Sequence, residues 1–278
     1  MDGGYLYGGG VYVQDAKVSI RGSTLSGNRV NTFVDEWIGF GGGIHNSGGT
    51  LLLKDSAVFE NVSVRLGSGG GISNGGDMII ENTSVGANTS PTPGGGIYNT
   101  GRLTLGGVTL ARNTVEGVYS VGIGELPYPS GCDVETPKNC FFGGGGLWNE
   151  ATGVVRISHS VVADNSVTRS GPSDCHGAMM SGGHTALGTD ADNCSLQQRQ
   201  RSDLVNIDAR LGDFEDNGDA GNAHYPLLAD SPLIDAAGRV SKTCSPRDQL
   251  GHRRVDGDRD GQIACDIGAV EWIPTRIR

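Results

Sequence analysis

The chain has few large aromatic side chains and no long apolar run. Its 278 residues include 6 Phe, 3 Trp and 7 Tyr, whereas glycine alone contributes 48. So few large side chains cannot fill one thick globular core, but they suffice for a thin core built layer by layer. No stretch approaches the roughly 20 apolar residues of a membrane-spanning helix. The composition therefore excludes a transmembrane segment and favours a repeat architecture.

Basic residues are also in the minority. The chain carries 21 Lys and Arg against 31 Asp and Glu, a formal net charge of −10. This surplus repels phosphate backbones and anionic lipid, so nucleic acid is not expected as a partner. The opening MDGGYLYGGG has neither the basic nor the apolar region of a signal peptide. Because it begins inside a repeat, we expect that earlier coils and an export signal have been removed.

Cysteine is absent before Cys132, and the chain has no CxxC or Cys/His zinc spacing. Six cysteines allow many pairings, but neighbours in sequence would each close a short local loop. Disulfides imply an oxidising compartment, and the alternative is a set of buried free thiols in a cytosolic protein. The neighbouring pairs are Cys132 with Cys140, Cys175 with Cys194, and Cys244 with Cys265.

A glycine-led unit recurs five times. Each unit opens with three glycines and an aliphatic residue, and 19 to 21 residues later comes an asparagine with an aliphatic residue three places before it. The spacing is nearly constant within units and variable between them, as in a solenoid with loops inserted at one corner. The units start at Gly8, Gly41, Gly69, Gly94 and Gly144, and their asparagines are Asn28, Asn61, Asn88, Asn113 and Asn165.

Short apolar alternations within each unit, such as Val18-Ser19-Ile20, predict strands. No helical segment separates them, which excludes a doubly wound α/β fold. We therefore predict an all-β parallel β-helix, or solenoid, with variable corner loops and a disulfide-stapled C-terminal end. Glycine and asparagine suit its corners because both tolerate positive φ. Two inward ladders are expected: Val11, Ile44, Ile72, Ile97 and Leu147, and Leu25, Val58, Val85, Leu110 and Val162.

The paired landmarks resemble the repeats of polymorphic outer-membrane proteins, over roughly residues 8 to 167. The C-terminal third is similar to choice-of-anchor bacterial surface proteins, in the blocks SDCHGAMMSGGHTALG, ADSPLIDAA, DQLGHRR and CDIGAVEW. These resemblances imply a right-handed parallel β-helix, secretion and attachment to the cell surface, but little about chemistry. The chain departs from the second pattern at its end, because only IPTRIR follows Trp272.

The segment VDGDRDGQIACD is the clearest candidate metal site. Alternate carboxylates on a tight loop can converge on a hard cation, as in the first half of an EF-hand loop, and we expect structural calcium. A Glu at the twelfth position is missing, since Ile267 stands there, so Asp266 or Glu271 would complete the shell. The alternative is a solvated acidic turn. The proposed ligands are Asp256, Asp258, Asp260, Gln262 and Asp266.

Two expected domains follow, continuous with one another. Residues 1–170 form the β-helix repeats, truncated at the N-terminus, and residues 171–278 form C-terminal coils with a cap stabilised by disulfides and calcium.

Two long insertions, NTFVDEWIGF and residues 116–142, are rich in aromatic residues. Aromatic faces beside carboxylates suit sugar rings, although such aromatics can also fold back over a coil. The candidate glycan-binding residues are Phe33, Trp37, Phe40, Tyr119 and Tyr128. The weak catalytic candidates are Asp35, Glu36, Glu125 and Asp133, which form a carboxylate pair only if the insertions meet in space.

The chain has no nucleophile elbow, P-loop or HExxH motif. The leading hypothesis is therefore a secreted or cell-surface β-helix protein without catalytic activity, which binds a glycan or another surface macromolecule through its corner loops. One alternative is a polysaccharide lyase or glycoside hydrolase that acts at the same face. Another is a structural spacer within a larger envelope protein.

Overall fold

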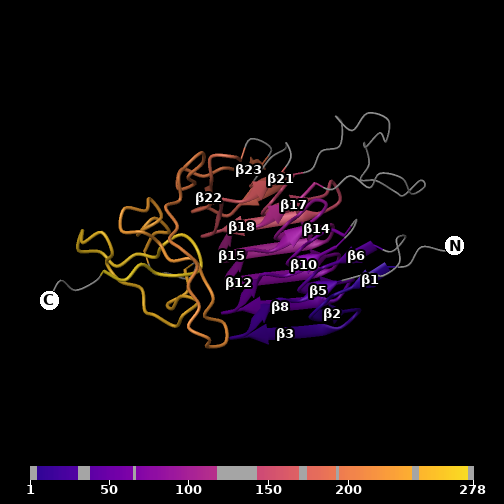
Figure 1. Ribbon diagram of the computed structural model, residues 1–278. Coiled ribbons are helices and arrows are strands. Elements are labelled where there is room, and N and C mark those ends of the chain that lie inside the picture. The colour runs from indigo at the N-terminus through magenta and orange to yellow at the C-terminus, as the bar shows by residue number, and fades with distance from the viewer. Residues whose placement is uncertain are drawn as a thin grey trace.

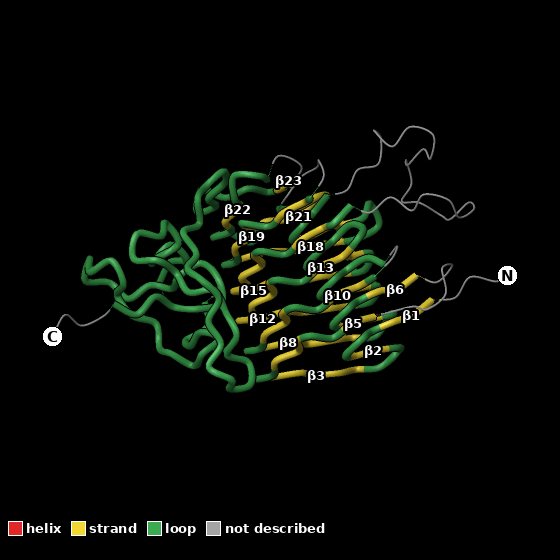
Figure 2. The backbone as a smooth tube through the Cα atoms, in the orientation of Figure 1, coloured by secondary structure: helices red, strands yellow, loops and turns green. Residues whose placement is uncertain are grey.

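A computed structural model describes residues 5–30, 38–64, 67–117, 143–168, 174–191, 194–239 and 244–274. All regular structure in these ranges is β-strand, and strands of successive coils pair in parallel (Figure 1, Figure 2). Across the same ranges, no helix has the length and apolarity needed to cross a membrane. The arrangement is compatible with the predicted β-helix.

The strands form columns in which each coil contributes one member. The first column contains β2 (Val11–Val13), β7 (Ile44–Asn46), β11 (Ile72–Asn74), β14 (Ile97–Asn99), β17 (Leu147–Asn149) and β21 (Cys175–Ser181). The second contains β3 (Lys17–Arg21), β8 (Thr50–Lys54), β12 (Asp77–Gly86), β15 (Arg102–Ala111) and β18 (Val154–Ser158), and it continues through β21 to β23 (Cys194–Gln197).

Shorter strands complete each turn of the chain. One further column contains β4 (Thr24–Ser26), β9 (Ala57–Phe59), the far halves of β12 and β15, β19 (Val161–Ala163) and β22 (Ala186–Leu187), each paired with the next. Another column contains β5 (Arg29–Val30), β10 (Val62–Ser63), β13 (Thr89–Ser90), β16 (Thr114–Val115) and β20 (Ser166–Val167). At the N-terminal end, β1 (Tyr5–Tyr7) pairs with β6 (Ile38–Phe40).

Both predicted aliphatic ladders are confirmed. Ile44 pairs in register with Val11 on one side and Ile72 on the other, and Val85 lies between Val58 and Leu110 in the same way. These side chains belong to one continuous core that runs through the coils. A narrow interior of this kind needs aliphatic residues at every second position and few aromatic ones, as the composition indicated.

The glycine triplets allow the coils to approach one another closely. The first glycine of the second triplet, Gly41, has a φ of 67°. A Cβ on Gly42 would lie 2.3 Å from the carbonyl oxygen of Gly70 in the next coil. No side chain fits at such a distance, so the repeated glycines are required by contact between coils as well as by the turn.

Stacked asparagines form a column at one corner, although they do not supply the positive φ expected of them. The residue before each one does, as Ala87 with a φ of 52° shows. The Oδ1 atom of Asn88 accepts hydrogen bonds from the backbone N and the Nδ2 of Asn61, and Asn88 repeats this pattern toward Asn113. Asn88 Nδ2 also donates to the carbonyl oxygen of Val58. A second column, which was not predicted from the sequence, lies at another corner and contains Asn46, Asn74, Asn99 and Asn149.

The first asparagine column ends on a carboxylate. Asp174 Oδ1 accepts hydrogen bonds from the backbone N and Nδ2 of Asn165, both at 3.0 Å. Asp174 is buried, and this burial raises the pKa of its carboxyl group to about 6 despite the two hydrogen bonds. The ionised form is therefore disfavoured in the folded protein.

The chain after Leu204 runs along the flank of the stack instead of adding further coils, and in Figure 1 it spans the height from β22 to β3. It covers small outward-facing residues, among them Ala57, Ala111 and Ala163, with its own apolar side chains. Gly221 N donates to Thr24 Oγ1 near the first coil, and Gly268 N donates to the His159 carbonyl near the last. The expected C-terminal coils are thus limited to the first part of residues 171–278, and the remainder lies beside the coils.

Two of the three expected disulfides are present. Cys175 is bonded to Cys194 and Cys244 to Cys265. The pair Cys132 and Cys140 lies outside the described residues. The first bond joins β21 to β23 within the stack. The second lies in the part of the chain after Leu204, residues 205–239 and 244–274, which we call the flanking segment.

We predict that Asn88→Ala destabilises the protein by about 3 kcal/mol, because it leaves several buried backbone and amide groups without partners at about 1–3 kcal/mol each. Urea unfolding would measure this loss. The control is Asn217→Ala, in which the same substitution is made at an exposed position. Equal effects of the two substitutions would contradict a structural role of the column.

We predict that Asp174→Asn stabilises the protein at pH 7.5 and has little effect near pH 4. A raised carboxyl pKa means that the destabilisation is absent below the unfolded value of 3.8 and develops as the pH rises through about 6. The expected gain at pH 7.5 is roughly 1–3 kcal/mol. Urea unfolding at both pH values, with the exposed Asp219→Asn as control, measures it. A loss of stability at pH 7.5 would show that the ionised carboxylate is preferred.

Candidate functional site

Aromatic and imidazole side chains form an outward-facing column along the first column of strands. They occupy the middle position of successive strands, where the two flanking residues point to the interior. Because the strands pair in register, these side chains repeat at the spacing of adjacent strands, ~4.8 Å. The column contains Tyr12, His45, Tyr98, Trp148 and, near the start of β21, His176, and Ser73 interrupts it between His45 and Tyr98.

At the N-terminal end, the column joins the aromatic residues of β1 and β6. The Tyr7 ring stacks on His45 at a centroid distance of 4.6 Å and on Tyr12 at 5.4 Å. Phe40 and Tyr5 extend this group, and Tyr5 and Phe40 lie 6.3 Å apart. We call Tyr5, Tyr7, Tyr12, Phe40 and His45 the aromatic platform.

The platform is exposed to solvent on its tyrosine side. Tyr5 is 53% exposed, Tyr7 39% and Tyr12 44%, whereas His45 is buried beneath them. Burial lowers the pKa of His45 to about 4, so its imidazole is neutral near pH 7. A monomeric protein seldom exposes several stacked aromatic rings together, and such a patch marks an interaction surface.

Farther along the column, a carboxylate joins two aromatic side chains. Glu150 Oε1 accepts hydrogen bonds from Tyr98 Oη and Trp148 Nε1, each at 3.0 Å. The Trp148 ring stacks on His176 at 3.8 Å. Trp148 is only 7% exposed, so this second group is less accessible than the platform.

Of the five aromatic residues predicted to bind a ligand, Phe40 is placed in the platform. The other four, Phe33, Trp37, Tyr119 and Tyr128, lie outside the described residues. The same holds for the catalytic candidates Asp35, Glu36, Glu125 and Asp133.

Sequence analysis missed the tyrosine side of the platform, although a signal was present. The residue after the aliphatic position of each glycine triplet is Tyr, His, Ser, Tyr and Trp in the five units. Since neighbouring residues of a strand point to opposite faces, this position faces outward whenever the aliphatic residue faces the core.

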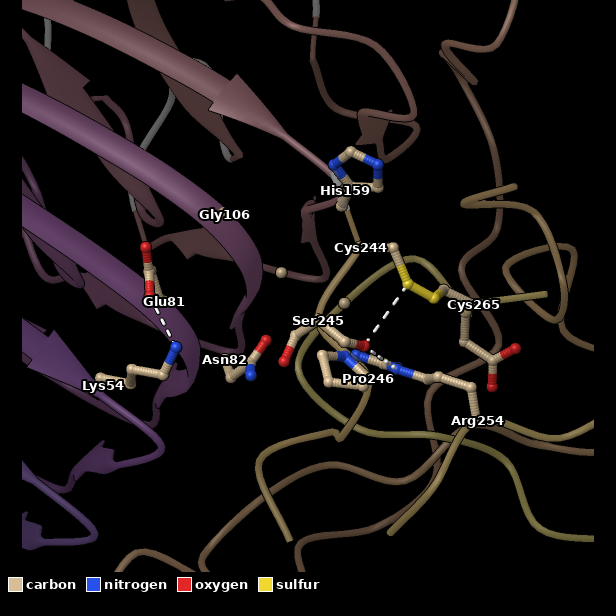
Figure 3. A pocket seen from close by; sticks show the side chains of 13 residues that line it. Lys54, Glu81, Asn82, Gly106, His159, Cys244, Ser245, Pro246, Arg254 and Cys265 are labelled. Atoms are coloured by element: carbon tan, nitrogen blue, oxygen red, sulfur yellow. Dashed lines mark hydrogen bonds and ion pairs between the residues drawn. A yellow bond between two sulfur atoms is a disulfide. The ribbon is translucent and has the colours of Figure 1, made fainter. Parts of the chain in front are cut away.

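A cleft of about 440 Å³ separates the stack from the flanking segment (Figure 3). Its wall on the stack side includes Gly106 and the ion pair between Lys54 Nζ and Glu81 Oε2, which are 2.8 Å apart. The opposite wall includes Arg254 and the disulfide of Cys265. The cleft therefore contains charged groups of both signs beside hydrogen-bonding groups.

Part of the predicted metal loop converges, together with a residue that sequence analysis missed. Carboxylate oxygens of Asp235, Asp256 and Asp258 all lie within 4.8 Å of one another. Buried Oδ1 atoms of Asp235 and Asp256 have no hydrogen-bond partner among the described residues. Burial is the main cause that raises the pKa of Asp235, and the charges of Asp258 and Asp256 add to it.

The other predicted metal ligands are engaged elsewhere. Asp260 accepts hydrogen bonds from the backbone and side chain of Gln262. Buried Asp266 accepts from the backbone N of Asp235 and Trp272, while Glu271 pairs with Arg254 at 2.7 Å. Burial and the charge of Glu271 raise the pKa of Asp266 to about 7. The converging group contains neither Asp260, Asp266 nor Glu271.

Comparisons with models of protein families, with curated proteins and with solved structures give no match to the chain. The class is therefore defined by geometry: an all-β protein of stacked parallel coils with an exposed aromatic platform at one end and an acidic loop in its flanking segment.

Proposed function

We propose that the protein is a secreted or cell-surface, right-handed parallel β-helix that binds a glycan, with the aromatic platform as the contact surface. The observation that carries this proposal is the group of stacked, exposed rings of Tyr5, Tyr7 and Tyr12. Sugar rings present C–H faces that pack on aromatic rings, while their hydroxyl groups form hydrogen bonds at the edge. The disulfides support an oxidising compartment.

The ligand in this proposal is a neutral glycan. The protein carries a formal net charge of −10, which disfavours a polyanionic chain. The platform offers apolar ring faces, phenolic hydroxyl groups and an imidazole that is neutral near pH 7. These groups match a ligand with many hydroxyl groups and no charge.

We predict that Tyr7→Ala and Tyr12→Ala each weaken binding to a neutral polysaccharide at least tenfold, which corresponds to about 1.4 kcal/mol. Affinity electrophoresis in gels that contain hydroxyethyl cellulose, xylan or laminarin measures the loss, and alginate serves as the anionic comparison.

The control variant is Ile79→Ala, which removes an exposed apolar side chain from β12 in the second strand column. It should migrate like the unmodified protein. The proposal fails if no neutral polysaccharide retards the protein, or if both tyrosine variants are retarded as strongly as the control.

We also propose a structural calcium ion, with a changed set of ligands. The two unpartnered carboxylate oxygens and the close approach of Asp235, Asp256 and Asp258 fit a hard divalent cation. Such an ion would offset the mutual repulsion of these carboxylates. Its binding would stabilise the flanking segment.

We predict that calcium raises the unfolding temperature and that a chelator reverses the change. At a calcium concentration of 100 times Kd, the stabilisation is about 2.7 kcal/mol. Asp256→Asn should abolish the shift, whereas Asp260→Asn, in the same loop but outside the converging group, should retain it. The site would be contradicted if calcium did not change the unfolding temperature, or if calcium shifted the unfolding temperatures of the two variants equally.

The enzymatic alternative predicts a different result in the same polysaccharide panel. A glycoside hydrolase releases new reducing ends, and a lyase produces unsaturated uronate absorbance, whereas a binding protein does neither. A structural spacer would neither bind nor cleave.

A further inference from the structure

The cleft beside the flanking segment contains open space at a position where the column has glycine. Arg21, Lys54, Glu81, Gly106 and Ser158 occupy equivalent positions in successive coils. Gly106 is the one member of this column without a side chain. A Cβ built there meets no atom within 4 Å, so neither the turn nor contact between coils requires this glycine. The absence of a side chain leaves open space between Glu81 and the flanking segment.

The charged groups that line the cleft already have partners. Asp266 accepts hydrogen bonds from the backbone N of Asp235 and of Trp272, and the other charged groups form ion pairs. Lys54 binds Glu81, and Arg254 binds Glu271 at 2.7 Å, with both members of the second pair almost fully buried. Arg254 Nε also donates to the carbonyl oxygen of Ser245. An anionic or cationic ligand would therefore have to compete with an existing partner.

The remaining polar groups of the wall suit an uncharged ligand. Asn82 and Ser245 line the cleft together with His159, which is 7% exposed and whose Nε2 has no hydrogen-bond partner among the described residues. Burial lowers the pKa of His159 to about 4, so the ring is neutral near pH 7. The His159 ring is positioned by stacking on His184 at 5.1 Å.

We propose that this cleft binds a neutral, monosaccharide-sized ligand rich in hydroxyl groups. The volume of about 440 Å³ is typical of a small-molecule site. Hydroxyl groups both donate and accept, so one ligand can bind the half-exposed Lys54 and Glu81 at the mouth and the amide and hydroxyl groups deeper in. The site shares no residue with the aromatic platform and does not depend on the glycan-binding proposal.

The test fills the hollow and measures binding of simple sugars. Saturation-transfer NMR with glucose, galactose, mannose, rhamnose and xylose, and with galacturonate and glucosamine as charged comparisons, detects contact with the full chain. We expect transfer to at least one neutral sugar that exceeds transfer to the charged ones. Gly106→Leu should reduce that transfer at least tenfold.

Two matched controls separate the cleft from general surface effects. Thr104→Leu adds the same side chain to an exposed position of β15, and it should bind as the unmodified protein does. Glu81→Gln should weaken binding, whereas Asp77→Asn, at an exposed ion pair on the same strand, should not.

Circular dichroism and thermal unfolding verify that each variant is folded. The proposal is overturned if no neutral sugar receives saturation, or if folded Gly106→Leu binds like Thr104→Leu. Retention of polysaccharide binding by Gly106→Leu distinguishes this site from the platform, because the platform lies on other strands.

Discussion

Hydrogen bonding between stacked asparagines sets the register on which the other features depend. Each asparagine of the first column links neighbouring coils, because its side-chain Oδ1 accepts a hydrogen bond from the backbone N–H of the asparagine in the preceding coil. A slip of one residue would turn the aliphatic ladder outward and leave these amides buried without partners. The same register aligns the outward positions, so the rings of Tyr12 and His45 lie side by side.

Much of the fold follows from the sequence because it depends on local, repeated constraints. The glycine triplets, the aliphatic alternation and the asparagine at a fixed distance each recur five times, and together they predict parallel coils and both ladders. The course of residues 205–239 and 244–274 was harder to predict. Its contacts with Ala57, Ala111 and Ala163 join segments far apart in sequence. A signal was nonetheless present in the uninterrupted apolar runs AVF and VVA, which are typical of strands buried on both faces.

The candidate sites were only partly predictable, for a related reason. The acidic loop supplies Asp256 and Asp258 by local spacing, but Asp235 comes from 21 residues earlier and is brought in by the fold. Asp266 is only ten residues from Asp256 in sequence, yet the fold places it outside the converging group, where it accepts hydrogen bonds from the backbone N of Asp235 and of Trp272. The cleft at Gly106 has no sequence signature, because a glycine required by close packing and a glycine that leaves a hollow look identical in the chain.

The flanking segment changes how the stack is held together. In a simple repeat array each unit contacts only its neighbours, so the ends can fray while the middle stays folded. Here the flanking segment extends from the last coils to Thr24 in the first coil, and the disulfide between Cys244 and Cys265 cross-links it. Unfolding of a terminal coil would therefore also break its contacts with the flanking segment, which packs on the central coils as well. The array is thus converted from a row of nearest-neighbour units into a single cooperative body.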